Sequence, residues 1–182
     1  MKRIAVFAAL LLAAAPGARA QPQAPAAPAA KPEEVGSMDA IIKTLYDVIS
    51  GPAGQARNWD RFRSLFAPGA RLIPTGRDAA GKSMIRAVWT PDDYVKTAGA
   101  NLEKNGFFER EIGRTVEQFG GVAQVFSVYD SKRTAADPKP FARGINSIQL
   151  YHDGTRWWVV TIFWEGESPT SPIPAKYLKP AN

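Results

Sequence analysis

Few side chains in this 182-residue sequence could perform acid–base or nucleophilic chemistry. The single histidine, His152, stands beside the turn residues Asp153 and Gly154, and turn tips face solvent, so we do not expect it to act as a base. The sequence has no cysteine and no Gly-x-Ser-x-Gly pattern that would mark a serine nucleophile. Glu165 is the best-placed carboxylate for a general base, because it follows Trp164 at the end of an expected strand.

Other polar and aromatic side chains could line a binding pocket. Asn146 has the strand parity of Ile148 and Leu150, so it either contacts a ligand or satisfies a buried backbone group. Trp89 and Trp164 come late in expected strands and could form the walls of a pocket, although large aromatics also belong to ordinary cores.

Two arginines interrupt the apolar pattern of the strand expected over residues 107–119. The apolar residues are Phe108, Ile112 and Val116, and they alternate with Glu109, Glu111 and Glu117. Arg110 and Arg114 share the apolar parity, so we expect them on the apolar face and the glutamates on the other. A buried arginine must be paired or bind an anion, so Arg114 is a candidate anchor for a carboxylate. The alternative is that both arginine stems lie along a solvated face.

Metal and cofactor motifs are missing from the sequence. One histidine without cysteines cannot build a zinc site, and no Asp-x-Asp-x-Asp-Gly pattern offers a carboxylate site for Ca²⁺ or Mg²⁺. Neither a Gly-x-Gly-x-x-Gly sequence nor a P-loop is present. We therefore expect no metal and no cofactor.

The first twenty residues have the layout of a secretory signal peptide. Lys2 and Arg3 precede an apolar run that is too short to span a bilayer, and Ala18-Arg19-Ala20 is a typical cleavage site. Cleavage removes three of the 23 basic residues and none of the 17 acidic ones, which lowers the net charge from +6 to +3. We expect a periplasmic or secreted protein, and no lipid anchor because no cysteine follows the cleavage site.

The remaining sequence predicts one domain with two flanking segments. Residues 21–35 form an Ala/Pro-rich linker, residues 36–167 the domain, and residues 168–182 a Pro-rich tail that Ile173, Tyr177 and Leu178 could fasten to the domain. The scattered positive charges argue against a nucleic-acid partner, and no later segment is apolar enough to cross a membrane.

Hydrophobic periodicity predicts an α+β fold. Helices are expected at residues 38–50, 59–66 and 91–105, and short strands at 70–75 and 83–89. Longer strands follow at 107–119 and 122–134, and then a terminal hairpin spans residues 141–167 with a two-residue turn at Asp153-Gly154. The second strand of that hairpin is apolar on both faces, so both faces should be covered.

Two sequence motifs resemble the NTF2-like, or SnoaL-like, superfamily. They are W-x-x-F-x-x-L-F-A-P-x-A-R-L from Trp59 to Leu72 and D-G-x-R-W-W-V from Asp153 to Val159. The resemblance implies a cone of curved, mostly antiparallel strands around three N-terminal helices, with an open apolar mouth and dimers in many members. It covers isomerases, dehydratases, hydrolases and cyclases as well as domains that only bind or dimerise, so it does not decide the activity.

The resemblance also provides a test for ketosteroid isomerase chemistry, which is a standard example of a tuned carboxyl group. Tyr46 matches the position of the family's hydrogen-bond-donating tyrosine, and it could equally be a core aromatic. Pro74 occupies the place of the family's catalytic base, and a proline cannot move a proton. The isomerase mechanism is therefore not expected.

The expected function is binding of a small, mostly apolar molecule in the cone, with an anionic end as one version. The pocket candidates are Tyr46, Trp89, Arg114, Asn146, Trp164 and Glu165. One alternative is a lyase, isomerase or hydrolase that uses Glu165 or Asp93 with Tyr46 as donor, and another is a dimerising interaction module. An enzyme requires a carboxylate of raised pKa in an apolar pocket near the Tyr46 hydroxyl.

Overall fold

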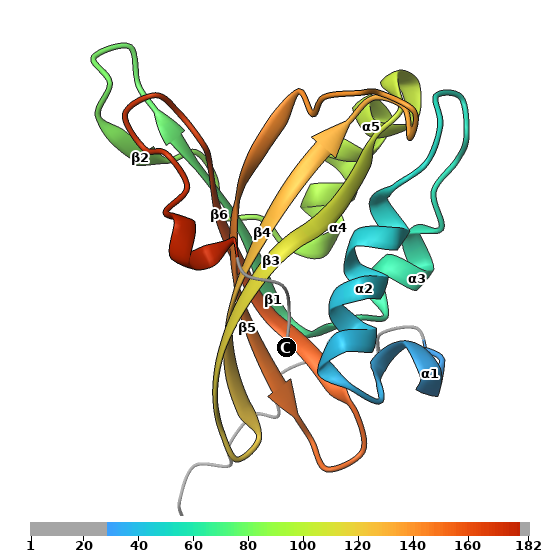
Figure 1. Ribbon diagram of the computed structural model, residues 1–182. Coiled ribbons are helices and arrows are strands. Elements are labelled where there is room, and N and C mark those ends of the chain that lie inside the picture. Colours follow the sequence, from blue (N-terminus) through green and yellow to red (C-terminus); the bar gives the residue numbers. More distant parts are fainter. Residues whose placement is uncertain (1–28, 179–182) are drawn as a thin grey trace, which may run out of the picture.

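The computed structural model describes residues 29–178, so the expected signal peptide lies outside the described residues (Figure 1). The helices are α1 Pro32–Val35, α2 Met38–Ile49, α3 Trp59–Arg63, α4 Pro91–Tyr94, the π-helical turn η1 Val95–Gly99, α5 Ala100–Asn105 and the short 3₁₀ helix η2 Ala175–Tyr177. The strands are β1 Phe66–Arg77, β2 Ser83–Ile85, β3 Phe108–Phe119, β4 Val122–Lys132, β5 Ala142–His152 and β6 Trp157–Gly166.

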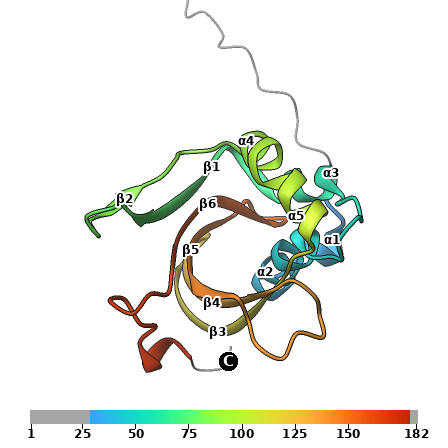
Figure 2. The ribbon, with the colours of Figure 1, turned by 90° about the horizontal axis from the view of Figure 1, so that it is seen from above.

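One six-stranded sheet organises the domain. Its strand order is β2-β1-β6-β5-β4-β3, and only the β1–β6 pair is parallel. Seen from above, strands β6 to β3 curl into an arc, with α2 at its open side and the β1–β2 hairpin projecting away (Figure 2). This is the expected α+β cone of mostly antiparallel strands.

The helices begin where the sequence places caps. The Ser37 hydroxyl accepts a hydrogen bond from the Ala40 N–H at the start of α2. Thr90 and Asp93 form a reciprocal capping box at the start of α4, and Pro91 occupies the first turn. Helix α2 turns its apolar side toward the sheet, and Ile41 and Ile42 are fully buried there.

Three element boundaries differ from the sequence prediction. Residues 32–35 of the expected linker form helix α1, because Val35 finds a buried place beside the core and is only 2% exposed. The second helix ends at Arg63, and Phe66 already begins β1. There Phe66 pairs with Val159, and a register irregularity follows before Arg71. The expected strand 83–89 is only three residues long.

The terminal hairpin has a longer loop than expected. Within this loop, Gly154 is the one residue with a positive φ, of 99°. The Asp153 N–H donates to the Arg156 carbonyl. The Asp153 carboxylate accepts hydrogen bonds from the N–H groups of Thr155 and Arg156, so it stabilises a wider turn without a positive φ of its own. The prediction that both faces of β6 are covered is also wrong, because Val160 and Phe163 are 37% and 42% exposed on the convex face.

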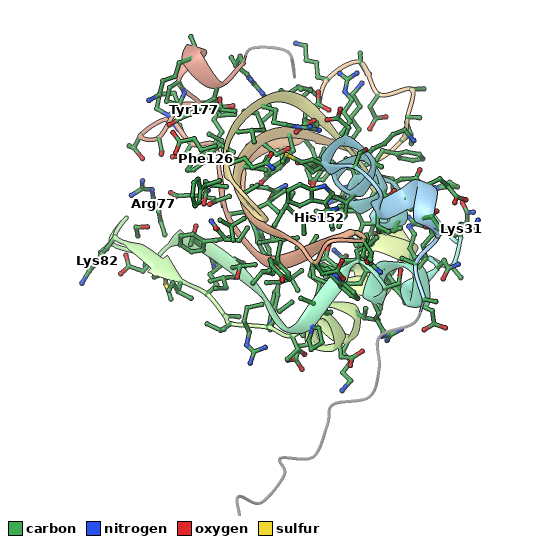
Figure 3. The ribbon with its side chains drawn as sticks, turned by 90° about the horizontal axis from the view of Figure 1, so that it is seen from below. Lys31, Arg77, Lys82, Phe126, His152 and Tyr177 are labelled. Atoms are coloured by element: carbon green, nitrogen blue, oxygen red, sulfur yellow. The ribbon has the colours of Figure 1, made fainter. Side chains whose placement is uncertain are left out.

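The C-terminal tail lies on the convex side of the sheet. The Tyr177 ring stacks on Phe126 of β4 with 5.4 Å between ring centroids (Figure 3). The Ile173 N–H donates to the Glu167 carboxylate at 3.0 Å. Ile173 and Tyr177 therefore fasten the tail as predicted, whereas Leu178 is 39% exposed. No helix within residues 29–178 is long and apolar enough to cross a membrane.

Candidate functional site

The concave side of the sheet encloses a cavity of about 130 Å³ beneath the helices. We call it the inner cavity; its lining residues are Leu45, Tyr46, Ile49, Phe62, Leu72, Tyr94, Phe107, Glu109, Tyr129, Asn146, Ile162 and Trp164. Nearly all of these side chains are apolar or aromatic. Glu109 is the one acidic residue among them, which makes it the first candidate for chemistry.

The surroundings of Glu109 favour the protonated form of its carboxyl group. Burial raises the pKa of its carboxyl group from 4.5 to about 7, and the nearby charge of Asp130 acts in the same direction. Hydrogen bonds from the Ser131 hydroxyl, at 2.7 Å, and from the Asn146 amide limit the rise. Glu109 can therefore accept or release a proton near neutral pH.

Tyr46 lies within a directed hydrogen-bond chain that runs from Asn146 through Tyr46 and Ser127 to Glu111. The Ser127 hydroxyl lies 2.6 Å from the Glu111 carboxylate, which only accepts, so Ser127 uses its single proton there. The Tyr46 hydroxyl, 2.6 Å from the Ser127 Oγ, must therefore donate to Ser127. Its oxygen accepts from the Asn146 amide at 3.1 Å. Burial raises the pKa of Tyr46, so this hydroxyl stays protonated.

One serine fixes Tyr46 and Glu109 relative to each other. The Ser50 hydroxyl donates to the Tyr46 carbonyl at 2.7 Å, at the end of α2. The same oxygen accepts the Glu109 N–H at 3.0 Å, at the start of β3. Because α2 and β3 are tied together at this point, their two functional side chains face the same cavity.

A β-bulge explains why the expected faces of β3 are wrong. Glu111 pairs with Tyr129, and the next pair is Gly113 with Val128, so Ile112 is the extra residue. The bulge inverts the alternation within the strand. Glu109 therefore faces the inner cavity, although the sequence pattern placed it on the outer face with Glu111.

Arg114 is buried as predicted, but it is not a free anion anchor. Its side chain is 8% exposed and donates to both oxygens of Glu111 and to Asp39 of α2. Arg110, which the pattern placed on the same face, is 68% exposed and holds Asp130 through two hydrogen bonds of 3.0 Å. Both guanidinium groups are thus neutralised within the chain.

The structure brings three of the six expected pocket residues together, namely Tyr46, Asn146 and Trp164. Trp89 packs against Trp164 with ring centroids 6.4 Å apart and supports the cavity wall from behind. Glu165 faces away from the cavity, 38% exposed and 3.6 Å from Arg77, so it is not the carboxylate partner of Tyr46.

Asp93 and His152 both lie outside the inner cavity. The Asp93 carboxylate accepts from the backbone N–H and the hydroxyl of Thr90, and these hydrogen bonds lower its pKa. His152 lies at the hairpin end with its ring against Trp157 (Figure 3). In residues 29–178, no three histidine or carboxylate side chains lie close enough together to hold a metal ion.

Sequence reasoning missed Glu109, although β4 contains a signal that points to it. Ser127, Tyr129 and Ser131 recur at every second position of β4, on the same face as the apolar residues Ala123 and Val125. Such a pattern indicates a buried face that satisfies polar groups on a neighbouring element. Two of these three side chains donate to the glutamates of β3.

A second, larger depression adjoins the inner cavity along the edge strand β3. We call it the outer groove; it measures about 460 Å³ and is lined by Lys43, Tyr46, Asp47, Ser50, Phe108, Glu109, Arg110, Glu111, Arg114, Asp130, Lys132 and Ala135. Tyr46 and Glu109 line both spaces. The two spaces therefore adjoin at these two residues.

Comparison with solved structures shows the fold. The chain is similar to a protein of unknown function with a cystatin-like fold from Nostoc punctiforme (TM-score 0.50, 10% identity, covering 75% of this chain and 96% of that one). It is also similar to a putative calcium/calmodulin-dependent protein kinase II association domain from Xanthomonas campestris (TM-score 0.51, 15% identity, 72% and 86% covered). An NTF2-like protein from Shewanella baltica aligns at a TM-score of 0.42 with 13% identity, over 72% and 98% of the two chains.

These features define the NTF2-like fold, as the sequence motifs indicated. No family model matches the chain, and no curated protein matches it either. At identities of 10% and 15% the likeness establishes the fold and no activity.

Proposed function

We propose that this protein binds a small, mostly apolar molecule in the inner cavity and that Glu109 receives a proton or hydrogen bond from it. The observation that supports this most directly is a carboxyl group in a cavity with mostly apolar and aromatic walls, where burial raises its pKa to about 7. Such a group is costly to bury, and perturbed carboxyl groups in clefts are concentrated at functional sites.

The cavity size restricts the ligand. An engineered, apolar cavity of about 150 Å³ in another protein takes up benzene. At about 130 Å³, the inner cavity fits one ring or a short branched chain, and a larger ligand has to extend into the outer groove.

A catalytic version of the proposal is favoured by the same pKa. A carboxyl group that titrates near 7 is suited to general acid–base catalysis at neutral pH, as in an isomerase or lyase that removes a proton from carbon. Glu109 replaces Glu165 and Asp93 as the base in this version. Tyr46 positions Asn146 and does not donate to the ligand, because its proton is engaged by Ser127.

Binding of two probes tests the proposal. Phenol and toluene have the same shape, but only phenol can donate to Glu109. We expect phenol to bind more tightly by about tenfold at about pH 8, where Glu109 is ionised, because a hydrogen bond to a charged group contributes about 1.5 kcal/mol or more. Isothermal titration calorimetry measures both affinities. Glu109→Gln should remove most of this preference.

Glu165→Gln is the matched control, since Glu165 lies on the other side of the sheet beside Arg77. It should leave the phenol preference unchanged. Equal binding of phenol and toluene to the unmodified protein would contradict the role of Glu109, and the absence of binding by either probe would contradict the proposal as a whole.

Pairing of two copies through the convex face is a further proposal. Val160, Phe163 and Tyr151 are exposed on β5 and β6, and Val122 is exposed on β4. Exposed apolar side chains on one sheet face favour association. The name of the Xanthomonas protein includes an association domain, which fits such a role. Sedimentation equilibrium of Phe163→Lys against the unmodified chain tests it, and a monomeric unmodified chain would refute it.

Export to the periplasm or beyond also stays a proposal, based on residues 1–20. Amino-terminal sequencing of the protein recovered from its natural cells tests it. A mature chain that begins at Gln21 supports export, and one that still begins at Met1 refutes it.

A further inference from the structure

Three tyrosines line the inner cavity, and two of them have a hydroxyl group without a partner in the protein. The Tyr46 hydroxyl takes part in two hydrogen bonds. The hydroxyls of Tyr94 and Tyr129 form no hydrogen bond with any other residue in the described part of the chain. Because a buried tyrosine hydroxyl usually has a partner, these two groups are an unused polar capacity of the cavity.

The missing partner is informative because both hydroxyls are withdrawn from bulk water. Tyr129 is 7% exposed, and burial raises the pKa of Tyr94 and of Tyr129. Tyr151, in contrast, is 46% exposed, so water satisfies its hydroxyl. Within residues 29–178, Arg77 Nε is the one side-chain nitrogen or oxygen that is sealed from solvent without a hydrogen bond. The two hydroxyls are therefore not sealed, and the space that both side chains border is the inner cavity.

A glycine on the neighbouring strand fixes the place of the Tyr129 hydroxyl. Gly144 of β5 is the cross-strand partner of Tyr129 in β4. A Cβ at Gly144 would lie only 2.4 Å from the Tyr129 Oη and 2.6 Å from its Cζ. Any other residue at this position would push the ring aside, so the Tyr129 ring can lie across β5 only because Gly144 has no side chain.

Aromatic contacts, and no polar ones, hold the side chain of Tyr94. Its ring stacks on Phe62 with 5.3 Å between ring centroids and meets the edge of Trp89 at 6.3 Å. Tyr94 is the last residue of α4, and the π-helical turn η1 begins at the next residue. Single π-helical turns of this kind are frequent at functional sites. The neighbouring rings position Tyr94 and leave its hydroxyl available to a ligand.

The inner cavity is small enough for one ligand to meet both hydroxyls and Glu109. At about 130 Å³ it holds about one ring, and a ring that fills it contacts most of the wall. The charge of Glu109 adds to the rise in pKa of Tyr94 and Tyr129, so the three groups lie near one another. Both hydroxyls stay protonated and can donate, whereas an ionised Glu109 can only accept. None of the lining residues is a lysine or arginine, so an oxygen that the hydroxyls bind should be uncharged.

We infer that the hydroxyls of Tyr94 and Tyr129 are the hydrogen-bond donors of the inner cavity, and that its ligand carries an uncharged acceptor oxygen for them. This inference rests on the proposed function and deepens it, because it adds a second polar requirement to the group that faces Glu109. A carbonyl, ether or hydroxyl oxygen meets the requirement, whereas a hydrocarbon or an ammonium group does not. A single hydroxyl group on the ligand could serve both sides, since it donates to Glu109 and accepts from a tyrosine.

Cyclohexanone and methylenecyclohexane test the inference by isothermal titration calorimetry, because they share one shape and only the ketone has an acceptor oxygen. At about pH 8 Glu109 is ionised and cannot donate to the ketone. The measured quantity is the ratio of the two affinities within each variant, so that hydration of the probes and a general loss of affinity cancel. Tyr94→Phe and Tyr129→Phe should each lower the ketone-to-hydrocarbon ratio by about fivefold, as expected for one neutral hydrogen bond, and the double variant should lower it further.

Tyr151→Phe is the matched control, because it removes the same hydroxyl from a side chain that is exposed and does not line the cavity. It should leave the ratio unchanged. A ratio that is the same in the unmodified chain and in both cavity variants refutes the donor role, and so does an equal fall in Tyr151→Phe. In either case the proposed function still depends on the phenol and toluene titrations alone. If neither the ketone nor the hydrocarbon binds, the inference is refuted, and phenol and toluene again decide the proposed function separately.

Discussion

Arg57 is buried and Glu109 is half-buried, and the surroundings of these two charged groups differ. The Arg57 residue is 8% exposed, and its guanidinium donates to the carbonyls of Ile49, Gly51 and Gln55 at 2.6–3.1 Å. Glu109 accepts from Ser131 and from the Asn146 amide, and its carboxylate lines both the inner cavity and the outer groove. Arg57 is saturated by the protein, and Glu109 is not.

This difference separates a structural polar group from a functional one. Arg57 satisfies the carbonyls where α2 ends, and a Cβ at Gly51 would lie only 2.7 Å from its Nη1, so the chain is shaped around the guanidinium. Glu109 keeps an unfilled capacity for a partner and a pKa displaced to about 7. Unused hydrogen-bonding capacity beside a cavity indicates function, whereas burial alone does not.

Loss of Arg57 should have the largest effect on stability. Arg57→Met removes the guanidinium donor from the buried carbonyls of Ile49 and Leu102, whereas the Gly51 carbonyl keeps the Phe107 N–H, and each unsatisfied buried group costs about 1–3 kcal/mol. We expect the free energy of unfolding to fall by about 4 kcal/mol or more in urea denaturation. Arg63→Met is the control, since Arg63 is 32% exposed and pairs with Asp60 and Asp92 at the surface. It should cost under about 1 kcal/mol, and similar losses for the two variants would contradict the distinction.

Removing the charge of Glu109 should raise the free energy of unfolding, whereas Arg57→Met should lower it. The folded chain holds this proton up to a pKa of about 7, against 4.5 when unfolded, so the native state binds more protons between these values. The free energy of unfolding therefore falls as pH rises through this window, by about 3 kcal/mol in total. Glu109→Gln lacks this loss and should be more stable than the unmodified chain at about pH 8.

Urea denaturation of both chains at several pH values measures the difference between them, so that other titrating groups cancel. The advantage of Glu109→Gln should shrink toward about pH 4. Glu165→Gln is the control for the loss of a surface carboxylate, since Glu165 is 38% exposed and lies beside Arg77. A pH-independent difference for Glu109→Gln would mean that the pKa of Glu109 is ordinary, and the proposed function would lose its main support.

The sequence was sufficient for the order of the main elements and for the fold class, because caps and periodicity are local properties. Ser37, Thr90 and Asp93 begin their helices as the residue types indicate. The position of the Asp153-Gly154 turn was predicted correctly, but its length was not. Hydrogen bonds to the Asp153 carboxylate take the place of the positive φ that a two-residue turn requires at Asp153. Side-chain contacts of this kind depend on geometry that residue types do not specify.

The candidate site was less predictable, because one bulge decided it. Alternation along β3 assigns Glu109 to the outside, and a single extra residue at Ile112 reverses that assignment. Asn146 and Tyr46 were found because their strand and helix are regular. The sequence indicated that Arg114 could be buried, but it did not indicate its role. Its partners Asp39 and Glu111 are brought together by the packing of α2 against β3, which the sequence alone does not reveal.

Tyr46→Phe should have the smallest effect and sharpens the contrast further. The hydroxyl touches Ser127 and Asn146 but, by the direction of its hydrogen bonds, no ligand. Its removal should cost about 1–2 kcal/mol of stability and leave the affinity for phenol within about threefold. A loss of phenol binding as large as that of Glu109→Gln would mean that Tyr46 donates to the ligand and that Ser127 donates to Tyr46.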